Sequence, residues 1–252
     1  RILIREVAER GVIDAERRDD MVELITGIRT KLLGGAKIDF SKAIDQLNQT
    51  DGEEFVGLGE LPSDIQLMKD YANALDGLSN SRRGRSLQTL TLCKQLNESI
   101  GLLVDPIQLE AAVYMHDFGM SLVSPNILQK EASLEKDELR SVQHHVFFGS
   151  RFLQRIGGWD DAALMVLQHH ERMDGTGYPF RVQGKHICIG ARLLAVADTF
   201  ISLTNERSDR TYKKTLFGAV REVNANAGAQ FDHELVERFN DVIRAFYLSS
   251  AT

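Results

Sequence analysis

The sequence is poor in cysteine: two in 252 residues. Cys93 and Cys188 stand far apart and form no C-x-x-C pair, and their number is far below that of a disulfide-stapled secreted domain. This scarcity excludes a small disulfide scaffold. It favours a protein of a reducing compartment, and we expect the cytoplasm.

A membrane-length hydrophobic run is also missing. The longest apolar stretch, 191–203, is interrupted by Arg192 and Asp198 and falls short of the roughly 20 residues that a span needs. Positive charge is in deficit as well, since 30 Lys and Arg face 36 Asp and Glu, a net charge of −6. We therefore expect no membrane span in the visible chain and no duplex nucleic acid as partner. Because the chain begins with Arg1 and not with Met, we leave open what precedes it.

Proline is scarce too, with four residues, and apolar side chains recur mostly at spacings of three and four. This pattern predicts an all-α fold. The polar stretch QTDGEEFVGLGE at 49–60 is the best candidate for a connection between two parts. We expect a smaller N-terminal helical segment over 1–74, with a regulatory or dimerisation role, and a helical bundle over 75–252.

Helix start and stop signals divide the second part further. Ser63 and Asp64 read as an N-cap, Gly101 as a helix stop, and Asp105 followed by Pro106 as a helix start. The helices expected after residue 60 cover 63–78, 85–100, 106–119, 135–156, 160–170, 190–206, 212–227 and 232–248.

Histidine is concentrated in one part of the chain, since all seven histidines follow residue 115. Five of them, His116, His144, His145, His169 and His170, each adjoin an acidic residue or another histidine. One such histidine alone is better explained as a hydrogen-bonded core or surface residue. The set is better explained as a metal site. Asp198 belongs with it, because a carboxylate inside the apolar run LLAVADTFISL needs a cation or strong donors.

The ligand types indicate the metal and the chemistry. Imidazoles and carboxylates from several helices of a bundle suit a divalent transition metal, Fe or Mn above all, with Ni, Zn or Mg as alternatives. A bridging carboxylate such as Asp117 would let two ions share the site. Paired ions stabilise the attacking and leaving oxygens of a displacement at phosphorus, so the ligand set favours phosphoester hydrolysis.

Four strings resemble the HD-GYP family, a branch of the HD phosphohydrolases. They are HDFG at 116–119, HVFFG at 145–149, HHERMDGTGYP at 169–179 and ARLLAVADTF at 191–200. The resemblance covers roughly 75–245. It implies an HD-superfamily helical bundle, a cytoplasmic signalling protein, and hydrolysis of the bacterial second messenger cyclic di-GMP to linear pGpG or GMP.

The resemblance also assigns residues. It implies one or two divalent transition ions, held by His116, Asp117, His145, His169, His170 and Asp198. Asp117, the expected bridging ligand, is catalytic in this interpretation. Arg207 and Arg210, which remain from the family's RPYR, are implied phosphate contacts, although Asp209 places a negative charge between them.

Three positions depart from the family pattern. Arg85 stands where the first metal-binding histidine is expected, Ser81 replaces an acid, and Met120 replaces the lysine of HDxGK. An arginine has no lone pair to offer a metal. Its guanidinium would instead pair with Asp117 or Asp198 and supply the charge of one missing cation, or it would point to solvent. We expect an ion that needs residue 85 to be absent or weakly held.

The loop Asp174–Pro179 carries the GYP signature. A turn of Asp, Gly and Pro needs no function to explain it. The resemblance nevertheless implies a place at the site mouth and contact with partners, notably GGDEF-domain proteins, and we leave a homodimer open. Two hypotheses follow: a phosphodiesterase of low activity, or a catalytically degenerate module that signals by binding cyclic di-GMP or a partner protein.

Overall fold

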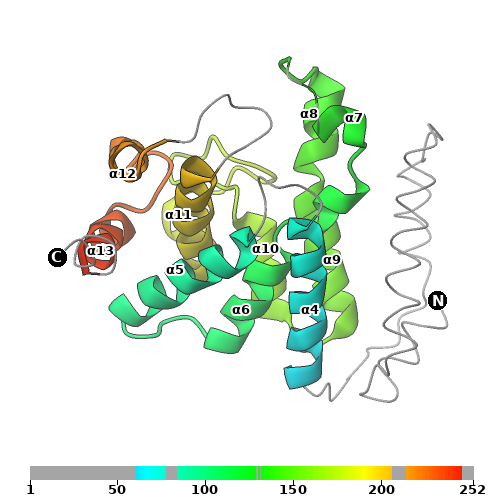
Figure 1. Ribbon diagram of the computed structural model, residues 1–252, viewed down its shortest axis with the longest axis horizontal. Helices are drawn as coiled ribbons and strands as arrows, with labels where there is room; N and C mark the ends of the chain where they lie inside the picture. The colour runs from blue at the N-terminus through cyan, green and yellow to red at the C-terminus, as the bar shows by residue number, and fades with distance from the viewer. Residues whose placement is uncertain (1–60, 78–83, 129, 131, 206–213, 246–252) are drawn as a thin grey trace.

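The computed structural model describes residues 61–77, 84–128, 130, 132–205 and 214–245, and these residues form helices and no strand (Figure 1). The all-α prediction is therefore confirmed for this part of the chain. The predicted helical segment upstream lies mostly outside the described residues and stays a prediction.

The helices follow one another with short connections and lie mostly where the apolar spacing predicts them. In chain order they are α4 (Leu61–Asp76), α5 (Arg85–Ser99), α6 (Pro106–Met115), the 3-10 helix η2 (Phe118–Leu122), α7 (Pro125–Leu128), α8 (Lys136–Gln143), α9 (His145–Ile156), α10 (Asp160–Gln168), the 3-10 helix η3 (Gly184–His186), α11 (Ile189–Thr204), α12 (Leu216–Ala225) and α13 (His233–Ile243).

Helix α10 lies at the centre of the bundle, in contact with α9, α11 and α6 (Figure 1). Helix α5 packs on α11, α6 and α13, so it covers the side of the bundle away from α9. Trp159, Phe200 and Phe239 are among the largest fully buried side chains. The helices thus enclose one apolar core, and the ends of several of them meet at its edge.

Helix α4 is part of this bundle. Met68 and Ala72 are buried in the core, and the Tyr71 hydroxyl donates to the carbonyl of Phe118 at 3.3 Å. The helix runs across the expected boundary between residues 74 and 75. The division of the chain at that point stays a prediction, while α4 packs with the helices that follow it.

The continuous helix predicted over 135–156 is wrong, because two helices, α8 and α9, meet at His144. The Nδ1 atom of His145 lies 2.6 Å from the carbonyl oxygen of Val142, which the backbone N–H of Val146 would occupy in an unbroken helix. The helices predicted over 160–170 and from 106 also end earlier, at Gln168 and Met115, one residue before a histidine. At each of these helix ends, a histidine stands outside the regular hydrogen bonding of the preceding helix.

Candidate metal centre

Three histidines stand at helix ends and share one local geometry. In each, ring Nδ1 lies 2.6 to 2.7 Å from the carbonyl oxygen of the residue three positions earlier: His116 with Val113, His145 with Val142, and His169 with Val166. The last carbonyls of a helix lack intrahelical donors, so the ring supplies one. Because a carbonyl only accepts, the ring proton is on Nδ1. In the neutral form of each ring, the Nε2 atom then carries the lone pair.

These lone pairs are buried and converge. The Nε2 atoms of His116, His145 and His169 make no hydrogen bond. The His169 ring centre lies 5.4 Å from that of His116, 5.5 Å from that of His145 and 4.0 Å from that of His170. A buried acceptor without a donor is destabilising. A cation at the point where the rings meet would remove that cost.

One set of side chains among the described residues has the spacing of a metal site. Ligand atoms of His145, His169 and His170 all lie within 4.8 Å of one another. Burial lowers the pKa of all three rings, and that of His170 to about 3, so they are neutral as ligands must be. Three imidazole nitrogens suit a divalent transition ion. The residues present therefore fit the metal that the ligand types predict.

Two carboxylates complete the centre. His116 Nε2 lies 3.6 Å from Asp117 Oδ2 and 3.5 Å from Asp198 Oδ1, too long for strong hydrogen bonds. Burial lowers the pKa of both His145 and His170, and the charge of Asp117 partly opposes that lowering. The same charge helps to raise the pKa of His116. The charge of Asp117 thus acts on His116 as well as on those two histidines.

Arg85 points into this cluster and not to solvent. Its Nη2 donates to Asp198 Oδ1 at 2.6 Å, which confirms the predicted pairing. Burial alone would raise the pKa of Asp198, but the Arg85 guanidinium and the His116 ring hold it well below its usual range. The start of the Arg85 helix is fixed by α4, because the buried Asp76 carboxylate accepts from the Ser86 N–H at 2.8 Å.

The glycines of the HDFG and HVFFG strings allow the helices to come this close. A Cβ on Gly119 would overlap the backbone of His145, and one on Gly149 would stand 2.9 Å from both the Met115 carbonyl oxygen and Val166 Cγ1. Since backbone cannot be displaced as easily as a side-chain tip, both positions need glycine. The conspicuous glycines of these motifs thus serve packing.

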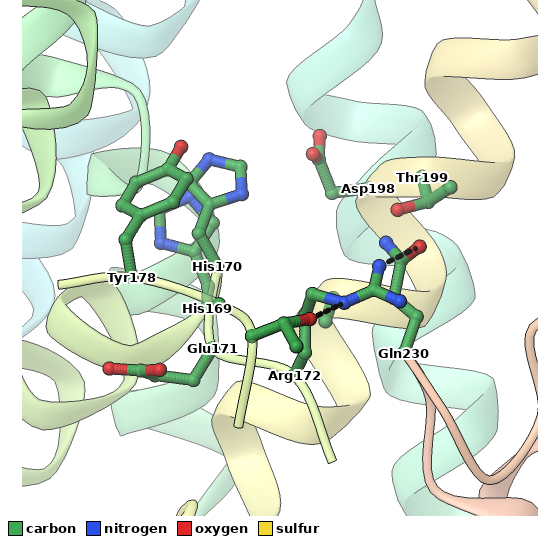
Figure 2. A pocket seen from close by; sticks show the side chains of 11 residues that line it. His169, His170, Glu171, Arg172, Tyr178, Asp198, Thr199 and Gln230 are labelled. Atoms are coloured by element: carbon green, nitrogen blue, oxygen red, sulfur yellow. Dashed lines mark hydrogen bonds between the residues drawn. The ribbon is translucent and has the colours of Figure 1, made fainter. Parts of the chain in front are cut away.

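A cavity of about 220 Å³ opens beside the histidines. His170 and Tyr178, whose rings stack with centres 4.8 Å apart, form one wall, and Asp198 with Thr199 forms the other (Figure 2). Gln230 lies at its end (Figure 2). The volume admits part of a nucleotide, such as one phosphate with its sugar, and not a whole dinucleotide.

The GYP loop forms part of this cavity and is held in place from two sides. Arg172 donates to Gln230 at 2.8 Å and to the Thr176 hydroxyl at 2.9 Å (Figure 2). On the other side of the loop, the buried Glu171 carboxylate, which points away from the histidines in Figure 2, accepts from the Phe180 N–H at 2.6 Å. The loop therefore forms a fixed wall of the cavity. This agrees with the position at the site mouth that the resemblance implies.

The structure brings the six predicted ligands His116, Asp117, His145, His169, His170 and Asp198 together, although their roles as ligands stay predictions. His144 is exposed and stands outside the group, as expected. Half-buried Met120 lies in η2 and brings no cation. Arg207, Asp209, Arg210 and Ser81 lie outside the described residues.

Sequence reasoning missed some of the support. The sequence does not identify Asp76 as a supporting residue, because its partner Ser86 is known only once α4 and α5 are placed in space. Thr199 and Gln230 were missed as cavity residues. The repeated spacing V-x-x-H, at 113–116, 142–145 and 166–169, was a signal that could have predicted the helix ends and the ring orientation.

Comparisons with known proteins agree with this geometry. A model of the HD domain family matches residues 65–235. The chain is 33% identical over 162 residues to 3'3'-cGAMP-specific phosphodiesterase 1 of Vibrio cholerae, covering 63% of this chain and 36% of that protein. It is 34% identical over 151 residues to the cyclic di-GMP phosphodiesterase response regulator RpfG of Xanthomonas campestris, covering 56% and 38%.

A solved structure shows the same fold. It is the cyclic GMP-AMP-specific phosphodiesterase V-cGAP3 of Vibrio cholerae, with a TM-score of 0.57 and 16% identity, over 74% of this chain and 50% of that one. The helices and the histidine-rich centre define an HD phosphohydrolase fold. The chain belongs to the HD-domain family, in the HD-GYP branch whose signature it carries at 174–179. It spans little more than a third of the length of the two curated relatives.

No helix among the described residues is long and apolar enough to cross a membrane.

Proposed function

We propose that this chain is a metal-dependent phosphodiesterase that hydrolyses cyclic di-GMP or a related cyclic dinucleotide at a low rate. The observation that carries the proposal is the convergence of His145, His169 and His170 beside a cavity that admits a phosphate and sugar. The names of the relatives support it, since they specify phosphodiesterases of 3'3'-cGAMP and of cyclic di-GMP.

The metal in this proposal is Fe or Mn, held by His145, His169, His170 and Asp117. When bound, such an ion lowers the pKa of a coordinated water and polarises a phosphoryl oxygen. Asp117 is placed to hold the ion toward His116, and Arg85 supplies positive charge beside Asp198. Water adds to one phosphodiester, the bond from phosphorus to the sugar oxygen breaks, and the product is the linear dinucleotide.

The reaction is tested with purified chain loaded with Mn²⁺ and incubated separately with cyclic di-GMP and 3'3'-cGAMP. Liquid chromatography of the products is expected to show the linear dinucleotide, formed more slowly than about 1 s⁻¹. His144→Ala is expected to retain the activity and His145→Ala to lose it. Absence of product from both substrates with metal-loaded protein would overturn the proposal.

Low activity is part of the proposal, because Met120 stands where the HDxGK pattern has a lysine. Loss of one preorganised charge stabiliser commonly lowers turnover by about 10² to 10³. Restoring both family residues, Met120→Lys with Arg85→His, is expected to raise hydrolysis at least about tenfold. Arg207 and Arg210 remain the proposed phosphate contacts.

A second candidate function is a binding module that holds a cyclic dinucleotide without turning it over. The absence of a cation at Met120 and the ion pair between Arg85 and Asp198 favour it. Calorimetric binding of cyclic di-GMP by a chain that yields no product would support this function over the first.

Partner binding belongs to the same proposal. Phe180, directly after the GYP sequence, is 58% exposed, and its ring meets Phe147 edge-on with centres 5.8 Å apart. An exposed aromatic on a fixed loop is a suitable contact for a GGDEF-domain protein or for a second copy of the chain. Because its substrate would be a second messenger, we also place the protein in the cytoplasm. Phe180→Ser would weaken the partner complex and spare dinucleotide hydrolysis.

A further inference from the structure

We propose that the centre holds a single metal ion, and that the Arg85 guanidinium takes the place of a second ion as a permanent cation of the fold. The inference deepens the proposed function and rests on its metal centre. It specifies how many ions the protein binds and which residues bind them.

The two sides of the cluster differ in how their charges are balanced. On the side of His145, His169 and His170, ligand atoms of the three rings lie within 4.8 Å of one another, and Nε2 of both His145 and His169 is buried without a hydrogen bond, as is Nε2 of His116. These atoms need a cation from outside. The described residues offer no other group of three such ligands at this spacing.

The opposite side already has its cation. Asp198 Oδ1 accepts from Arg85 Nη2 at 2.6 Å, and the same oxygen lies 3.5 Å from His116 Nε2. An ion bound to that oxygen would stand within a few ångströms of the guanidinium. The two positive charges would repel each other in a region where water cannot screen them, because the Arg85 and Asp198 side chains are only 14% and 11% exposed.

The Arg85 guanidinium stays charged because it cannot lose its proton in a protein, and it has no lone pair with which to bind an ion. Its backbone is also held, since Asp76 accepts from the N–H of the next residue, Ser86, at 2.8 Å. The negative charge of Asp76 also favours the charged form of the guanidinium. Arg85 is thus fixed in place as part of the bundle.

The first test counts ions in the unmodified chain. Metal-free protein is loaded with Mn²⁺, dialysed and analysed by elemental analysis and electron paramagnetic resonance. We expect about one ion per chain and the six-line spectrum of an isolated Mn²⁺. Two tightly held ions per chain, or the spectrum of a coupled pair, would overturn the inference.

Substitution of Arg85 provides the second test. Arg85→His replaces the cation with a ligand, and we expect the count to rise to about two with a coupled spectrum. Arg85→Lys is the matched control, because it keeps the charge, and its count is expected to stay at about one. A folded Arg85→His protein that still binds one ion would overturn the inference. If that variant does not fold, the count in the unmodified chain decides.

The third test separates the two sides. Asp198→Asn is expected to keep the single ion, whereas His145→Ala is expected to lose it. Loss of the ion in Asp198→Asn would place the ion on the Arg85 side and overturn the inference. Since these measurements use the metal alone, they do not depend on turnover. One ion without hydrolysis would overturn only the proposed function, and two ions with hydrolysis would overturn only this inference.

Discussion

The two sides of the candidate metal centre contain similar residue types but differ in how their charges are balanced. His145, His169 and His170 bring three imidazoles together, and Nε2 of both His145 and His169 is buried without a hydrogen bond, whereas Asp198 on the other side is paired with Arg85. The first side is incomplete without a ligand from solution. The second side has its own cation in Arg85, although Nε2 of His116 makes no hydrogen bond there.

The difference shows that ligand-like residues alone do not define a metal site. Asp198 and His116 match a metal-binding pattern as well as His169 does, yet an arginine occupies the space beside them. What distinguishes the two sides is whether the neighbouring charge is already balanced. Substitutions on each side, and the pH dependence of stability, test that distinction.

The histidine side is tested with two adjacent histidines. His145→Ala removes a ring of the close group, and we expect metal affinity to fall by more than about 100-fold, since even loss of an outer hydrogen-bond partner of a ligand costs 10 to 100-fold. His144→Ala removes an exposed ring one position away and should leave affinity unchanged. Titration of Mn²⁺ by calorimetry measures both. Equal effects of the two variants would contradict the assignment.

The arginine side is tested through stability. Asp198→Ala leaves the Arg85 charge buried and unpaired, and the free energy of unfolding of metal-free protein is expected to fall by about 3 to 5 kcal/mol. The double variant Arg85→Met with Asp198→Ala removes both charges and should recover most of the loss. Urea denaturation measures the three proteins. A double variant no more stable than Asp198→Ala would show that the charge is not the cause.

The contact that joins the two sides is tested at Gly119. Gly119→Ala places a Cβ against the backbone of His145, next to Asp117, and is expected to lower the free energy of unfolding by about 1 to 3 kcal/mol and to weaken metal binding. Gly77→Ala is the control, because its Cβ would first meet backbone oxygens at an ordinary 3.4 Å. Thermal denaturation compares them, and a tolerated Gly119→Ala would mean that η2 can move away from α9.

The smallest effect is the pH dependence of the metal-free protein. Burial lowers the pKa of His145, His169 and His170 below that of the unfolded chain, about 6.5. The unfolded state therefore binds more protons below that pH, and stability is expected to fall as the pH is lowered from about 6.5. His116, whose pKa is raised by Asp117 and Asp198 against its burial, acts in the opposite direction.

Each such proton changes the free energy of unfolding by about 1.4 kcal/mol per pH unit. His170, with a pKa of about 3, contributes from about pH 6.5 down to about pH 3. His170→Gln is therefore expected to reduce the slope between pH 6 and pH 4 by about that amount, measured by urea denaturation at several pH values. An unchanged slope would mean that the ring is solvated in the folded protein.

Much of the fold and of the site could be predicted from the sequence. The apolar spacing gave the helices, and the signal of Asp105 followed by Pro106 is confirmed, since the Asp105 side chain accepts from the N–H groups of Ile107 and Gln108. The histidine strings predicted that His116, Asp117, His145, His169 and Asp198 come together, although His145 was expected inside a helix and not at its start. These features depend on residues that are close in the sequence, where spacing carries the information.

The parts that could not be predicted depend on distant partners. Arg85 and Asp198 are 113 positions apart, and the sequence left the arginine free to pair or to face solvent. The break at His144 was missed because the apolar spacing continues through it. There the ring of His145 competes for a helical carbonyl, which a periodicity argument does not consider.

The helix-end geometry of His116, His145 and His169 has a consequence for the entropy of ligand binding. Each ring is already held by a hydrogen bond to the last turn of the helix that precedes it, so its orientation and proton position are set before any ion arrives. Little rotational freedom is left to lose, and an ion gains affinity from rings that need no rearrangement. The metal-free and metal-loaded proteins should consequently share nearly the same backbone, with the difference confined to the protonation and small shifts of the rings.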